Sequence, residues 1–219
     1  MLPTLNPASA LALVFVDDAV VVMNKPSGLL SVPGRGADKA DCASTRVQQL
    51  YSDALVVHRL DMGTSGLLVM ARGLQHQRTL NQSFAARQVH KRYIAEVAGA
   101  LPVQAEWQEI NLPISADWPR RPLRVIDPLH GKPSLTRWRC IACDEQRQTS
   151  RLELEPITGR SHQLRVHLQA IGHPILGDAL YAPDQIQSMV QRLHLHACQL
   201  AFPHPGHGQK VEFFIAPDF

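Results

Sequence analysis

The sequence predicts a mixed α+β fold in one domain. Short apolar runs that alternate with polar residues are frequent, whereas only about three stretches have helical periodicity. There is no alternating strand–helix–strand series and no glycine-rich phosphate-binding fingerprint, so folds that bind nucleotide cofactors are disfavoured. Hydrophobic residues make up 45% of the 219 residues, which is ample for a packed core.

The first half of the chain predicts strands separated by two helices. Two short strands surround the Asp17–Asp18 turn and end at a Pro-Ser-Gly turn. A short helix is expected from Ser44, with that serine as its N-cap. The remaining expected elements are a strand–loop–strand over 55–71, a helix over 74–88 and a strand over 91–99.

The second half predicts a hairpin, a helix and two closing strands. Residues 112–133 are rich in Pro and Arg and are expected to form a long irregular surface segment. Leu164, Leu168 and Ile171 have helical spacing, and Gly172 ends that helix. The other expected elements are a hairpin over 135–143 and 150–156, the helix over 161–172, and strands over 193–202 and 211–216.

The net charge of +3 conceals two strongly basic blocks. Residues 58–93 contain Asp61 as their only acid, and residues 118–139 contain Asp127 as theirs. The cations of the two blocks are Arg59, Arg72, Arg78, Arg87, Lys91 and Arg92, and Arg120, Arg121, Arg124, Lys132, Arg137 and Arg139. Blocks of this kind fit either a polyanion partner with phosphate groups or a solvated charged face.

Membrane, secretory and metal functions are disfavoured by the sequence. The apolar run Leu11–Val16 is too short to span a bilayer, and no basic residue precedes it. Four cysteines without a secretory signal indicate reduced thiols. Cys140 and Cys143 form a CxxC on an expected strand, where alternation would point their sulfurs to opposite faces, so packing is favoured over metal binding. Hydrogen-bonded structural roles are likewise favoured for the histidines, including the pair His194 and His196.

Asp61 is the strongest candidate for chemistry. It lies in a polar, glycine-containing loop between two apolar strands, and its neighbours in the sequence are basic. An aspartate at such a position can be a simple turn residue. An ionised carboxylate held rigidly among cations can instead act as a nucleophile.

Arg165 and Tyr93 are further candidates. Arg165 borders the apolar stripe of its helix, so it is expected to pair with a carboxylate, either Asp61 or an alternative such as Glu153 or Glu155. Tyr93 follows Lys91 and Arg92, and an aromatic ring among cations can stack on a nucleic-acid base. The alternative for Tyr93 is an ordinary strand residue that faces the core.

Six segments, in order along nearly the whole chain, resemble the motifs of the RluA-type pseudouridine synthases. They are NKPSGLLSVPG (24–34), HRLDMGTSG (58–66), KRY (91–93), PITGRSHQLRVH (156–167), GHPILGD (172–178) and LHA (195–197). The resemblance implies the pseudouridine synthase fold, a mixed and largely antiparallel sheet with flanking helices and a basic cleft. It also implies a single catalytic domain over 1–219, with a core from about residue 11 and no S4-type domain before it.

The resemblance implies a reaction and a role for each site residue. Uridine in 23S rRNA, in a tRNA anticodon arm or in both would be isomerised to pseudouridine without a cofactor or a metal. Asp61 matches the catalytic nucleophile, which would attack C1′ of the ribose or C6 of the uracil, or act through a glycal. Arg59 matches the residue that fills the space left by the flipped base. Tyr93 matches the residue that stacks on that base, and Arg165 the partner of the catalytic aspartate.

The resemblance also sets expectations about partners and leaves two alternatives. We expect a cytoplasmic monomer that binds RNA but no membrane and no nucleotide cofactor. The Arg-rich segment 118–139 is a candidate for RNA selection. A non-catalytic RNA-binding protein would have no use for a carboxylate at Asp61. A nuclease would require a carboxylate cluster or a histidine pair, and the HRLD motif has one acid.

Overall fold

The computed structural model describes residues 11–34, 36 and 39–219, and these residues divide into two compact units. The first unit contains the described residues up to Val89 together with Leu200–Ile215, and the second contains His90–Gln199 and Ala216–Phe219. Strand β11 (Leu195–Pro203) contributes its first five residues to the second unit and its last four to the first. No described helix is both long and apolar enough to cross a membrane.

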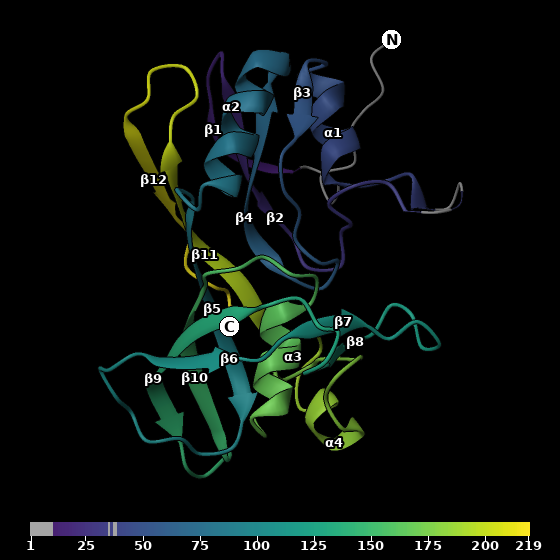
Figure 1. The fold of residues 1–219 in the computed structure, drawn as a ribbon, viewed down its shortest axis with the longest axis vertical. Coiled ribbons are helices and arrows are strands. Elements are labelled where there is room, and N and C mark those ends of the chain that lie inside the picture. The colour runs from purple at the N-terminus through teal and green to yellow at the C-terminus, as the bar shows by residue number, and fades with distance from the viewer. Residues whose placement is uncertain (1–10, 35, 37–38) are drawn as a thin grey trace. The chain divides into compact units, whose positions relative to one another are not determined.

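The first unit is a sheet with two helices (Figure 1). Strand β4 lies at its centre, because β2 and β3 both pair with it in antiparallel register. Helix α2 packs against β3 and β4, and α1 packs against β3. The strands are β1 (Ala12–Val16), β2 (Val20–Lys25), β3 (Ala54–Val56), β4 (Ser65–Arg72) and β12 (Lys210–Phe214), and the helices are α1 (Ala43–Leu50) and α2 (Gly73–Ala85).

The core of the first unit explains the long apolar runs in the sequence. Every residue of β4 from Ser65 to Ala71 is buried, as expected for a strand covered on both faces. One packed cluster takes alternate residues of β2 and β4 and adds Leu80 of α2. Its buried members are Ala19, Val20, Val22, Leu67, Val69, Ala71, Leu80, Val89, Leu200 and Phe202.

The second unit combines a four-stranded antiparallel arrangement with a helix (Figure 1). Strands β5, β10, β9 and β6 are neighbours in that order. Helix α3 packs against β8, β9 and β10. The elements are β5 (His90–Ala98), β6 (Gln108–Asn111), β7 (Ile114–Ala116), β8 (Arg124–Ile126), β9 (Leu135–Asp144), β10 (Thr149–Pro156), α3 (Gln163–Ala170) and α4 (Asp184–Gln187).

The predicted α+β class is confirmed, and every strand pair with a determined register is antiparallel. Two local predictions were wrong. The segment 112–133 is not wholly irregular, because β7 and β8 within it pair as a short hairpin. Helix α1 is capped by Cys42 and not by Ser44, since Cys42 and Thr45 exchange hydrogen bonds between side chain and backbone at the first turn.

The prediction that Cys140 and Cys143 point to opposite faces was also wrong. Cys140 lies opposite Leu152 of β10, whereas Ala142 lies opposite Arg151, so Ile141 is an extra residue in a β-bulge. Because the bulge shifts the alternation by one residue, Cys143 lies opposite Ser150, on the same face as Cys140. Both thiols are free.

Candidate active site

Asp61 lies in the loop that joins β3 to β4 in the first unit, and the backbone around it is anchored by residues 27–31. The Ser31 hydroxyl donates to the Leu60 carbonyl at 2.7 Å and accepts from the Leu60 amide at 3.0 Å. On the other side of Asp61, the Ser27 hydroxyl donates to the Gly63 carbonyl at 2.7 Å. The loop is therefore held on both sides of Asp61 by hydrogen bonds, buried at Ser31 and partly buried at Ser27, while Asp61 itself is half-buried.

Lys25 is a buried cation behind this loop, and the sequence analysis did not single it out. Its amine has no exposed surface and donates to the carbonyls of Pro26 at 2.8 Å, Leu29 at 2.8 Å and Met62 at 3.1 Å. Burial lowers the pKa of Lys25 to about 8, and the negative charge of Asp61 opposes this shift. The only feature of the sequence that could have indicated a role for Lys25 was its place in the NKPSG motif.

The start of the loop is fixed by His58, and Arg59 extends from it. The Nε2 atom of His58 accepts from the Val69 amide at 3.1 Å, and the imidazole stacks on Phe84 with ring centroids 4.9 Å apart. Arg59 is exposed and forms no ion pair with any described residue. The loop thus presents a guanidinium group two residues from the Asp61 carboxylate.

Tyr93 lies on β5 in the second unit, with Leu154 of β10 opposite it. The predicted alternation is confirmed, since Tyr93, Ala95 and Val97 are buried and Arg92 faces the other side. Only 9% of Tyr93 is exposed. Its neighbour Lys91 has the same orientation, and burial lowers the pKa of that amine.

Several cations of the two basic blocks are neutralised within the second unit. Arg92 forms ion pairs with Glu153 at 3.2 Å and Glu155 at 3.9 Å, and its guanidinium lies 4.4 Å from the centre of the Trp107 ring. Arg139 pairs with the same Glu153 at 2.6 Å. These arginines belong to a structural network on the sheet, so the basic blocks offer fewer cations to a polyanion than their composition predicted.

Arg165 of α3 is buried and holds a carboxylate that the sequence analysis did not consider. Its Nε and Nη2 atoms donate to the two oxygens of Asp178 at 2.8 and 2.6 Å. Asp178 is fully buried and also accepts from the amides of Leu180 and Tyr181. Asp61 belongs to the first unit and Arg165 to the second, so their pairing stays a prediction.

His167 and His194 have hydrogen-bonded structural partners, the kind of role that the sequence favoured for the histidines. His167 is buried, with Nδ1 2.9 Å from the Thr136 hydroxyl and Nε2 2.9 Å from the Leu112 carbonyl. His194 contacts Glu96 at 2.8 Å and stacks on Phe219. Within the described part of the chain, no three His, Cys, Asp or Glu side chains gather closely enough to hold a metal ion.

Residues 19–170 match the family model for RNA pseudouridylate synthase. The chain is 47% identical to the dual-specificity RNA pseudouridine synthase RluA of Vibrio parahaemolyticus, over 94% of this chain and 83% of that protein. It is 46% identical to the protein of the same name from Escherichia coli K12, over 95% of this chain and 94% of that one.

A solved structure agrees with this assignment. The human RNA Pseudouridylate Synthase Domain Containing 1 matches with a TM-score of 0.78 and 27% identity, over 98% of this chain and 86% of that chain. The chain therefore belongs to the RNA pseudouridylate synthase family and is an enzyme of that class. Asp61, Arg59, Tyr93 and Arg165 all lie inside the matched range.

Proposed function

We propose that this enzyme isomerises specific uridines to pseudouridine in stem-loops of 23S rRNA, of tRNA anticodon arms or of both. The observation that carries the proposal is the Asp61 loop. Its backbone is fixed by Ser27, Ser31 and Lys25, while Asp61 itself is only half-buried. A rigid, accessible carboxylate is what a nucleophile requires, because a mobile one would lose its attack geometry.

The proposed reaction exchanges one bond at C1′ of the ribose for another. The C1′–N1 glycosidic bond breaks, the uracil turns, and C5 bonds to C1′, while the hydrogen on C5 leaves to water as a proton and N1 takes up a proton from water. Asp61 acts as the nucleophile, at C1′ or at C6, or assists formation of a glycal. No metal or cofactor is needed, because electron count and charge balance within the nucleoside.

Base flipping gives the other site residues their proposed roles. A uridine stacked in RNA must leave the stack, which costs a few kcal/mol. Arg59 fills the vacated space, where its planar guanidinium can stack on bases and contact phosphates. Tyr93 stacks on the flipped uracil, and Arg165 supports the Asp61 carboxylate. We further expect a monomer in a reducing cytoplasm, in keeping with the free thiols of its four cysteines.

A tritium-release assay tests the reaction and the nucleophile together. Total rRNA and tRNA labelled at uracil C5, from cells that lack this protein, are incubated with wild type, Asp61→Ala and Asp61→Asn. Wild type is expected to release tritium to water, and both variants are expected to lose release by at least about 10⁴-fold while still binding RNA. Turnover by either variant at a hundredth of the wild-type rate would reject Asp61 as the nucleophile.

A further inference from the structure

A concave pocket in the second unit has no role in the chemistry assigned above. Its volume is about 480 Å³, within the range of sites that hold small ligands. It is lined by residues of β7 and β8, of the segments that follow each of these strands, and of the turn before α3, among them Trp118, Arg124, His130, Lys132 and Arg160. Tyr93 and Arg165 are not among the lining residues.

Two cations of the second basic block that have no ion pair with a described residue, Arg124 and Lys132, line the pocket. Arg137 and Arg139 of that block pair with glutamates on the sheet, and Arg120 pairs with Asp117. Lys132 has no ion pair with a described residue, and no Asp or Glu is among the described residues that line the pocket. Asp127 pairs with the lining residue His130 at 3.8 Å, but Arg124, Lys132 and Arg160 leave the pocket with an excess of positive charge. A cationic concavity of this kind attracts an anion.

Arg124 supplies a second, independent indication of a missing partner. Its Nε atom is buried and has no hydrogen-bond partner among the described residues. Buried donors without partners are rare in folded proteins, because each one loses its hydrogen bond to water. A ligand acceptor seated in the pocket would satisfy this donor if the Arg124 side chain turned toward it.

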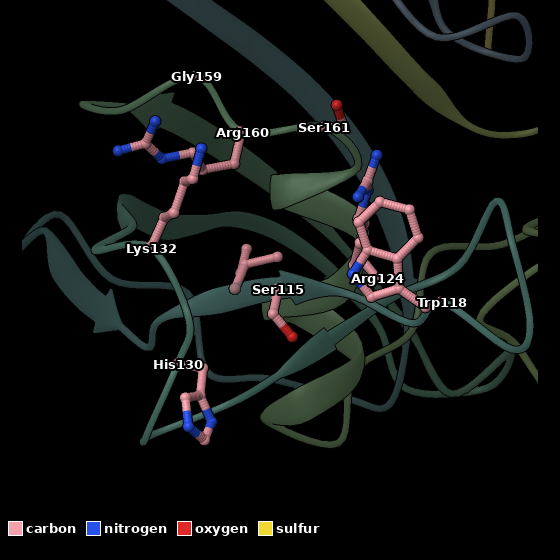
Figure 2. A pocket seen from close by; sticks show the side chains of 10 residues that line it. Ser115, Trp118, Arg124, His130, Lys132, Gly159, Arg160 and Ser161 are labelled. Atoms are coloured by element: carbon pink, nitrogen blue, oxygen red, sulfur yellow. The ribbon is translucent and has the colours of Figure 1, made fainter.

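The exposed ring of Trp118 indicates that the ligand carries an aromatic group next to its anion. The indole is 69% exposed, which is unusual for so large an apolar side chain. Arg121 lies 3.5 Å from the centre of its ring and so fixes the ring's position. In Figure 2, Lys132 and Arg160 lie on one side of the pocket, and Trp118 and Arg124 lie on the other. Cations opposite an aromatic plane match the phosphate and the base of one nucleotide.

We propose that this pocket binds one unpaired nucleotide of the RNA substrate, other than the target uridine, with its phosphate on Lys132 and Arg160 and its base against Trp118. The inference rests on the proposed function, because that function identifies RNA as the partner. A base inside a duplex is stacked on both faces and cannot enter a concave pocket. The pocket therefore selects RNA whose loop or bulge offers a free base at the right distance from the target.

The first experiment measures affinity for two RNAs with the full-length protein. One is a tRNA anticodon stem-loop and the other is a blunt duplex of equal length. Trp118→Ala is expected to weaken stem-loop binding by about 5- to 150-fold, the value of one stacked base, and to leave duplex binding unchanged. Trp118→Phe is expected to restore most of the affinity. Phe214→Ala, at 67% exposure on β12, is the matched control and should change neither affinity.

The second experiment tests the phosphate side of the pocket. Lys132→Gln is expected to reduce the slope of log affinity against log salt by about one for the stem-loop, because one phosphate contact is lost. Arg147→Gln is the control, since Arg147 is exposed in the β9–β10 turn and has no ion pair with a described residue. An unchanged slope for Lys132→Gln would remove that residue from the binding site.

The outcomes separate this inference from the proposed function. Equal stem-loop affinity for wild type and Trp118→Ala, or an equal loss on the duplex, would overturn the pocket assignment. Wild-type protein that binds the stem-loop through Trp118 but releases no tritium from any labelled RNA would reject the isomerisation and leave the pocket intact. If wild type and Trp118→Ala release tritium with the same KM, the pocket assignment would be rejected and the isomerisation would stand.

Discussion

Among the described residues, each unit buries one long cationic side chain, and the two cations are satisfied in different ways. Lys25 of the first unit donates to three backbone carbonyls. Arg165 of the second unit forms a two-pronged pair with the buried carboxylate of Asp178. Carbonyl dipoles compensate a buried charge only in part, whereas a paired carboxylate cancels it. Burial lowers the pKa of Lys25 to about 8, and the negative charge of Asp61 offsets only part of that shift.

The comparison shows two ways of fixing a functional group with a buried charge. Lys25 joins two loops, since its acceptors lie in residues 26–29 and at Met62 beside Asp61. Arg165 is instead fixed itself, because Asp178 holds both of its prongs and the Tyr181 ring lies 5.0 Å from its guanidinium carbon. In the first unit the cation is the support for the proposed nucleophile, and in the second the cation is the supported group.

The largest expected effect on stability comes from removing the Asp178 carboxylate that pairs with Arg165. Asp178→Asn leaves a guanidinium buried without its counter-charge, and breaking one side of a buried pair costs about 3–5 kcal/mol. We expect the free energy of unfolding in urea to fall by that amount. Asp184→Asn is the matched control, because Asp184 is exposed and has no ion pair with a described residue. A loss below about 1 kcal/mol would mean that Arg165 does not depend on Asp178 for its charge balance.

Lys25→Met should have the next largest effect. The substitution removes a buried charge, which is favourable, but it leaves the carbonyls of Pro26, Leu29 and Met62 without their donor. We expect a net loss of about 2 kcal/mol in the free energy of unfolding at pH 7. Tritium release should fall at least about tenfold, because the Asp61 loop loses one of its anchors. Unchanged release would show that Ser27 and Ser31 hold the loop without Lys25.

The stability difference between wild type and Lys25→Met should depend on pH, because only the wild type has the buried amine. Lys25 has a folded-state pKa of about 8 and an ordinary value of 10.5, so between these values the unfolded chain binds the extra proton. Stability of the wild type therefore rises with pH through this window, by about 1 kcal/mol per pH unit, as the buried charge is lost. The difference between wild type and Lys25→Met should grow from pH 8 to pH 10. A constant difference would show that the Lys25 amine is not the titrating group.

The sequence predicted the secondary structure best where the pattern was long. The Asp61 loop was found because the apolar strands β3 and β4 flank a polar segment, although β4 begins at Ser65, two residues before its apolar run. The β7–β8 hairpin was missed because each strand has three residues, too few to display alternation. The bulge at Ile141 was missed because an extra residue in a ladder depends on the partner strand, which the local pattern does not encode.

The candidate site was predicted in its residue types but not in its supports. Asp61 and Arg165 were found by their positions beside apolar runs, and the motifs matched them to a family. Asp178 was missed because it follows α3 by several residues in a turn, and only the folded chain brings it to Arg165. Lys25 was missed because the end of a strand gives no sign that a lysine will be fully buried.

The smallest expected effect concerns two tyrosines, one in each unit, that lie under an arginine. The Arg72 guanidinium carbon lies 5.1 Å from the Tyr51 ring centre, and that of Arg165 lies 5.0 Å from the Tyr181 ring centre. The hydroxyl of Tyr181 also accepts from the Arg124 amide at 2.9 Å and shares a hydrogen bond of 2.7 Å with His162. The rings are therefore matched in their contact with a cation, and their hydroxyls have different surroundings.

Replacing each tyrosine by phenylalanine isolates the hydroxyl. Tyr181→Phe should lower the free energy of unfolding by about 1 kcal/mol, because the Arg124 amide loses its acceptor, and Tyr51→Phe should change it by less than about 0.5 kcal/mol. The rate of tritium release at saturating RNA should stay within about twofold for both, since Asp178 and not the Tyr181 hydroxyl fixes Arg165. A tenfold fall for Tyr181→Phe alone would instead make that hydroxyl, and the strand β8 it holds, part of what positions Arg165.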